Sequence, residues 1–135
     1  MSEMIIRLRK LADHIHSMDS GSPDAKLLYD AADRLHLLDT PSFLAVLAAR
    51  MNQIAEGFDA AHDDKHDRGE LALAAACYAL AVTDHTDKSL IYESIWPFER
   101  KWFKPKGKRH NLGIAGAFIG TELDRLQRID EMDIS

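Results

Sequence analysis

Six side chains that can carry chemistry lie within nine positions near the middle of the chain: His62, Asp63, Asp64, His66, Asp67 and Glu70. Imidazoles suit zinc and carboxylates suit harder cations, which makes His62, Asp64, His66 and Glu70 candidate metal ligands. No His-Glu-x-x-His motif and no calcium-loop spacing accompanies them. The acids equally predict a helix entry at which Asp63, Asp64 or Asp67 caps free amides. We expect no bound metal or other cofactor and no catalytic residue, with a metal-dependent phosphohydrolase as an alternative.

A second candidate site is a cationic, aromatic segment further along the chain. Residues 100–110 read RKWFKPKGKRH and hold six Lys or Arg and no acid, whereas the rest has 11 basic against 22 acidic side chains. Aromatic faces beside cations suit a stacked base with its phosphates. This predicts ligand contacts from Trp96, Trp102, Lys104, Lys106 and Arg109. The competing interpretation is a solvated turn with at least one tryptophan anchored in the core.

Composition restricts the class of protein. The 135 residues suit one domain, or a domain with an appendage, and the formal net charge of −5 excludes a uniformly basic nucleic-acid binder. We expect no sequence-specific contact with nucleic acid. The single cysteine, Cys77, excludes a disulfide framework and is expected to be buried and inert. Apolar runs are too short for a membrane span or a signal peptide, which predicts a cytoplasmic protein without membrane contact.

Helical periodicity dominates the sequence, and no strand pattern is convincing. Serine or threonine before proline begins helices at Pro23 and Pro41. We expect an all-α fold: an N-terminal helical hairpin over residues 1–39, followed by a compact domain over 40–131 with a three-helix core and an irregular aromatic and basic segment. Residues 69–82 are apolar almost all round and predict the central buried helix.

Apolar stripes on the other helices predict their buried faces. In the hairpin the first stripe is Met4, Leu8, Leu11, Ile15 and Met18, which is available for a homo-oligomer. In the third helix the stripe is Leu44, Leu47, Ala48, Met51, Ile54 and Ala55. In the last helix, near 109–130, it is Leu112, Ala115, Phe118, Ile119, Leu123, Leu126 and Ile129. The face formed by Gly113, Gly116 and Gly120 predicts close helix packing or, alternatively, the approach of a flat ligand.

Residues 44–128 resemble a widespread family of small tailed-phage and prophage proteins. The resemblance is carried by LAARMNQIAEGFDAAHDD, by His66 with GELALAAACYA at 69–79, by WPFERKWFKPK at 96–106 and by ELDRL. It implies an accessory role such as host takeover or counter-defence in the bacterial cytoplasm. The 1–39 hairpin lies outside the resemblance and looks like an exchangeable segment.

A second pattern is similar to the ryanodine-receptor repeat, a small helical module associated with nucleotide-like ligands. It is carried by Arg50, Gly57-Phe58, Asp63-Asp64 and Lys65-His66. The similarity implies that Arg50, Phe58, Asp63, Asp64 and His66 line a ligand pocket, and His62 joins them as a candidate. In that arrangement the two aspartates accept from ribose or a base edge, and Arg50 neutralises phosphate.

Together these patterns predict a binding protein that sequesters a nucleotide-like ligand without turnover, as a homo-oligomer. The alternative of a different class is a protein-interaction inhibitor or adaptor that acts on a host defence protein or a nucleic-acid enzyme through its acidic surface.

Overall fold

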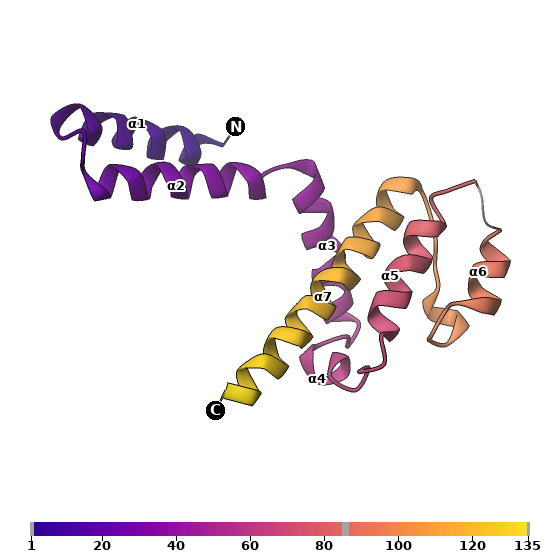
Figure 1. Ribbon diagram of the computed structural model, residues 1–135. Coiled ribbons are helices and arrows are strands. Elements are labelled where there is room, and N and C mark those ends of the chain that lie inside the picture. Colours follow the sequence, from indigo (N-terminus) through magenta and orange to yellow (C-terminus); the bar gives the residue numbers. More distant parts are fainter. Residues whose placement is uncertain (1, 85–86, 135) are drawn as a thin grey trace. The chain divides into compact units, whose positions relative to one another are not determined.

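The computed structural model describes residues 2–84 and 87–134, which form seven α-helices, one short 3-10 helix and no strand (Figure 1). The prediction of an all-α fold is therefore confirmed. None of the helices in this described part of the chain is long and apolar enough to cross a membrane. The chain divides into two compact units, residues 1–44 and residues 45–135, and each is described by itself.

The first unit is a helical hairpin. Helix α1 spans Glu3–Met18 and helix α2 spans Pro23–Leu38. The hydroxyls of Ser2 and Ser22 accept from the third amide that follows each of them, which satisfies one free N–H at each helix start. Arg9 adds an ion pair with Asp33 across the hairpin, with 2.7 Å between Nη2 and Oδ1.

The buried seam of the hairpin differs from the predicted stripe. Met4, Leu11 and Met18 are exposed, and the fully buried positions are instead Ile5, Ala12, Ala25 and Ala32. Alanines allow two helix backbones to approach closely, so the contact centres on them and turns the longer side chains to its edges. An apolar face of the hairpin thus stays uncovered, on α1 and at Leu27, Leu37 and Leu38.

The second unit is built around two helices that pack along each other, α5 (Glu70–Leu80) and α7 (Lys108–Ile134) (Figure 1). Helix α3 (Pro41–Ala55) leads into this unit, and a short α4 (Ala60–Asp63) follows it. Helix α6 (Lys88–Ser94) packs against α5, and the 3-10 helix η1 spans Arg100–Trp102. The helices α4 and α6 fall in segments for which the sequence predicts a loop and an irregular stretch.

Helix α5 carries much of the core, as its sequence predicts, but its face at Ala72, Leu73, Ala76 and Ala79 is exposed. Leu71, Ala74, Ala75, Cys77 and Tyr78 are all buried, and they join Ile91, Trp96 and Phe118 in the hydrophobic core. Burial raises the pKa of the Cys77 thiol to about 11. The thiol is therefore protonated at neutral pH and shielded from solvent, as expected of an inert cysteine.

The predicted inner faces of α3 and α7 are wrong in large part. In α7 five residues of the predicted stripe are 40–62% exposed: Leu112, Ile119, Leu123, Leu126 and Ile129. The buried face of α7 consists instead of Asn111, Gly113, Ala115, Ala117, Phe118, Thr121 and Arg125. In α3 the large stripe residues Leu44, Leu47, Met51 and Ile54 are 48–62% exposed, and its buried residue is Gln53.

The buried face of α7 packs mainly along α5, and two glycines of α7 also contact α3 closely. A Cβ atom added at Gly113 would lie 3.2 Å from the Ala45 carbonyl oxygen, and one added at Gly116 would lie 2.7 Å from Val46 Cγ2. The glycine face therefore packs helix against helix at these two positions, as the first of the two sequence interpretations holds. Gly120, by contrast, faces open space, since nothing lies within 4 Å of its added Cβ.

We predict opposite effects on stability for two alanine substitutions in α7. Gly116→Ala forces a methyl group against the stiff, β-branched Val46 and should lower the free energy of unfolding by about 1–3 kcal/mol. Gly120→Ala, the matched control, meets nothing and should raise it by up to about 1 kcal/mol through helix propensity. Urea unfolding followed by circular dichroism measures both, and equal effects would contradict the α3–α7 contact.

Candidate ligand-binding pocket

The second unit contains a pocket of about 500 Å³, a volume in the range of small-molecule sites. Helix α3, Phe58, the α5 residue Tyr78, the segment 96–106 and the first half of α7 all contribute to it. Its aromatic side chains are Phe58, Tyr78, Trp96, Phe98, Trp102 and Phe118. Its polar and charged side chains are Asn52, Gln53, Glu56, Lys104, Lys106, Arg109 and His110.

Tyr78 holds the aromatic part of the irregular segment in place. Its hydroxyl donates to the Trp102 carbonyl oxygen at 3.2 Å and accepts from the Lys104 N–H at 2.9 Å. Burial raises the pKa of Tyr78, so the hydroxyl keeps the proton that it donates. Trp96 is buried, stacks on Phe103 with 4.9 Å between ring centroids, and donates from its indole to the Glu99 carbonyl. The expected core tryptophan is therefore Trp96.

Asn111 holds the basic part of the same segment. Its Oδ1 accepts from the Lys106 N–H at 2.8 Å, and its Nδ2 donates to the Lys106 carbonyl oxygen at 3.1 Å. Asn111 is fully buried near the start of α7, so this pair fixes the lysine backbone against the helix. The Lys104 ammonium lies 5.6 Å from the centre of the Trp102 ring, which joins the cationic and aromatic parts of the lining.

Phe58 enters the pocket because of the way in which α3 ends. Gly57 adopts a φ of 100°, which favours glycine, and donates to the Ile54 carbonyl oxygen. The Phe58 N–H donates to the Gln53 carbonyl oxygen at 2.9 Å, which completes a Schellman motif. The Phe58 ring then lies 5.0 Å from the Trp102 ring and 4.6 Å from the His62 ring, both edge to face.

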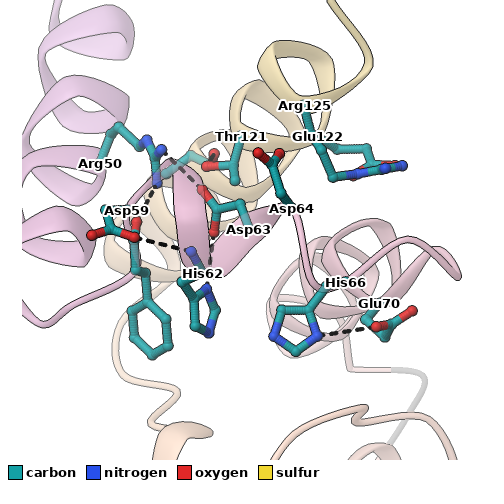
Figure 2. Close-up of polar contacts among 12 residues, drawn as sticks. Arg50, Asp59, His62, Asp63, Asp64, His66, Glu70, Thr121, Glu122 and Arg125 are labelled. Carbon is teal, nitrogen blue, oxygen red and sulfur yellow. Dashed lines mark hydrogen bonds and ion pairs between the residues drawn. The ribbon is translucent and has the colours of Figure 1, made fainter. Parts of the chain in front are cut away.

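A buried ion pair supports this corner (Figure 2). Asp63 is only 1% exposed, and its Oδ2 accepts from Arg50 Nη2 at 3.1 Å. Its Oδ1 lies 3.1 Å from His62 Nδ1. Arg50 Nη1 also donates to the Phe58 carbonyl oxygen, at 3.1 Å. Asp63 thus contacts both Arg50 and His62, and Arg50 also bonds to the backbone carbonyl of Phe58.

The remaining candidates of the 62–70 loop bond to different partners. Asp64 pairs with Arg128, with 2.7 Å between Oδ1 and Nη2, and His66 Nδ1 lies 3.0 Å from Glu70 Oε2. Burial would raise the pKa of the Glu70 carboxyl, but the hydrogen bonds from His66 and from the Arg68 N–H outweigh it and lower the pKa below its ordinary value.

The loop residues do not converge on a metal site. Within residues 2–84 and 87–134, no three His, Cys, Asp or Glu side chains gather closely enough to hold a metal ion. The predicted capping aspartates are also wrong: Asp59 caps α4 by accepting from the His62 N–H, and Gly69 precedes α5. The aspartate that caps a helix in this region is therefore Asp59, which lies one turn before the first predicted cap, Asp63.

The pocket brings together about half of the residues predicted to bind ligand. Those that line it are Phe58, Trp96, Trp102, Lys104, Lys106 and Arg109. Those that lie outside its lining are Arg50, His62, Asp63, Asp64 and His66. Sequence reasoning missed the polar residues Gln53, Tyr78 and Asn111. Tyr78 offered one signal, since its hydroxyl stands within an otherwise apolar helical run and needs a partner there.

Comparisons with protein-family models, with curated proteins and with solved structures find no match to this chain. The functional argument rests on the geometry of the pocket.

We predict that Asp63 acts through the fold. Asp63→Asn leaves the Arg50 guanidinium, itself largely buried, without its counter-charge, and should lower the free energy of unfolding by about 3–5 kcal/mol. The matched control, Asp64→Asn, removes a solvent-exposed pair with Arg128 and should cost less than about 1 kcal/mol. Chemical unfolding of the two variants distinguishes them, and a small loss for Asp63→Asn would contradict the buried ion pair.

Proposed function

We propose that the chain is a binding protein whose pocket takes a nucleotide-like ligand, a flat aromatic group joined to phosphate. The observation that supports this most is the composition of the pocket lining, in which aromatic faces stand next to three cationic side chains. Purely apolar ligands need no such cations, and a bare anion needs no aromatic faces. A ligand with both parts matches both features.

The aromatic faces suit a stacked base. The Trp102 ring meets Phe58 edge to face, and the Lys101 and Lys104 ammonium groups lie 5.2 and 5.6 Å from its centre. Tyr78 fixes the backbone on both sides of Phe103, so Trp102 is carried by a rigid support. A preorganised aromatic face loses little conformational entropy when a base stacks on it, which favours tight binding.

The cations suit the phosphate. Lys104, Lys106 and Arg109 line the pocket and are exposed, so their charges keep their hydration until a ligand arrives. Asn111 holds the Lys106 backbone, which brings the two lysines next to the first turn of α7. Because the rest of the chain is strongly acidic, these cations form a local positive patch on a protein that is otherwise negatively charged.

Binding without turnover is part of the proposal. The ionisable pocket-lining groups are Glu56, Tyr78, the three cations and His110, and the Tyr78 hydroxyl is already engaged on both sides. In the setting that the phage resemblance implies, the protein would sequester a nucleotide messenger of host immunity in the bacterial cytoplasm.

We predict that Lys106→Ala weakens binding of a phosphate-bearing ligand about 10-fold, because one charge-assisted contact is lost. The matched control is Lys108→Ala, since Lys108 lies two residues away, is exposed and does not line the pocket. It should change the affinity less than two-fold. Isothermal titration with nucleoside monophosphates, ADP-ribose and cyclic dinucleotides measures both variants.

Two outcomes of this titration would contradict the proposal. The first is that none of these nucleotides binds to the wild-type protein. The second is that Lys106→Ala and Lys108→Ala weaken binding equally, because the effect would then come from net charge alone.

A second candidate function, protein interaction, is favoured by the uncovered apolar face of α3. Leu47, Met51 and Ile54 lie exposed on that face, although their spacing is that of a buried stripe. We propose that a second copy of the chain covers it in a homo-oligomer; a host defence protein is the alternative occupant.

Native mass spectrometry should give a dimer or larger species, and Met51→Glu should convert it to a monomer. A wild-type monomer at micromolar concentration would contradict this.

A further inference from the structure

One buried polar side chain of the pocket lining has no hydrogen-bond partner among the described residues. Gln53 is 6% exposed, and among the described residues nothing donates to its Oε1 or accepts from its Nε2. Buried side-chain amides are normally hydrogen-bonded, because leaving both atoms unpaired costs free energy on folding. A leucine at this position would avoid that cost, so the amide calls for an explanation in terms of function.

The position of Gln53 points to the pocket. It lies on the last turn of α3, about half a turn from the exposed Met51, and it lines the pocket together with Asn52 and Phe58. Its backbone carbonyl oxygen accepts from the Phe58 N–H, so the Schellman motif that brings Phe58 in also fixes the backbone of Gln53. The backbone of Gln53 is therefore fixed beside Phe58, and its side chain contributes to the pocket lining.

We propose that Gln53 recognises the edge of the ligand's ring and restricts the ligand to heterocycles with a hydrogen-bond donor next to an acceptor, as nucleobases have. This inference rests on the proposed function and adds the chemical class of the ring. A glutamine side chain offers one acceptor and one donor group side by side, which matches such an edge with two parallel hydrogen bonds. Bases also have the flat faces that suit Trp102 and Phe58.

The physical reason for specificity is the buried state of the amide. A ring without a donor and an acceptor leaves both polar atoms of Gln53 unpaired, as they are in the free protein, so its binding gains nothing from the amide. A base pairs both atoms and removes a penalty that the free protein already carries. Aromatic phosphates that lack such an edge should therefore bind weakly.

The test is Gln53→Leu, a substitution of similar size that removes both polar atoms. Isothermal titration with AMP, GMP, CMP, UMP and the cyclic dinucleotides of adenine and guanine should show about a 10- to 100-fold loss of affinity for the nucleotides that bind the wild type. The melting temperature of the free protein should be unchanged or higher, because an unpaired buried amide is replaced by an apolar group. A purely structural glutamine would lower the melting temperature instead.

Two controls separate recognition from other effects. Gln127→Leu is the same substitution at an exposed α7 residue outside the pocket, and it should leave nucleotide affinity unchanged. Phenyl phosphate supplies a ring and a phosphate without a donor–acceptor edge. Its binding, or its failure to bind, should be the same in the wild type and in Gln53→Leu.

The possible failures are distinguishable. If the wild type binds none of the nucleotides, the proposed function is wrong. If the wild type binds a nucleotide and Gln53→Leu binds it within two-fold, the pocket binds nucleotides but the role of Gln53 is overturned. A lower melting temperature together with weaker binding of phenyl phosphate would also overturn it, because it would assign Gln53 to the fold.

Discussion

The buried carboxylate of Asp63 is the constraint on which the second unit depends. A charge removed from water must be compensated, and Arg50 from α3 supplies the counter-charge, while His62 Nδ1 lies 3.1 Å from the Asp63 Oδ1 atom. Arg50 also holds the carbonyl of Phe58, so the same pair joins α3, its C-terminal turn and α4 into one rigid corner. Phe58 is bonded to this ion pair through its carbonyl oxygen, and its ring packs against Trp102 in the pocket wall.

The wall formed by the segment 96–106 contains only the short 3-10 helix η1 and depends on two buried polar residues. Tyr78 bonds to the backbone of Trp102 and Lys104, and Asn111 bonds twice to the backbone of Lys106. Each residue stands on one of the two central helices, α5 and α7. An irregular segment thereby acquires a defined conformation, because its backbone hydrogen bonds, which a helix would satisfy internally, are satisfied from the core.

This arrangement explains why the site could be predicted only in part. The basic and aromatic residues of the segment 96–109 were identified because local composition is visible in the sequence. The similarity to the ryanodine-receptor repeat predicts that the loop residues bind the ligand, but the same acids and imidazoles serve equally in a support. Their partners, such as Arg128 for Asp64, lie far away along the chain, and only folding brings them together. Gln53 gave no signal, since an amide that directly follows Asn52 looks like a surface position.

The sequence by itself determined the all-α class, the starts of α2 and α3 at their prolines, and the place of α5 in the core. These properties depend on neighbouring residues and on local hydrogen bonding. Only the tertiary structure decided which faces of α3 and α7 are buried. Both helices have apolar residues on more than one side, so periodicity alone cannot choose between them. Packing along α5 settles the choice for α7, and at Gly113 and Gly116 the close approach of Ala45 and Val46 also needs small side chains.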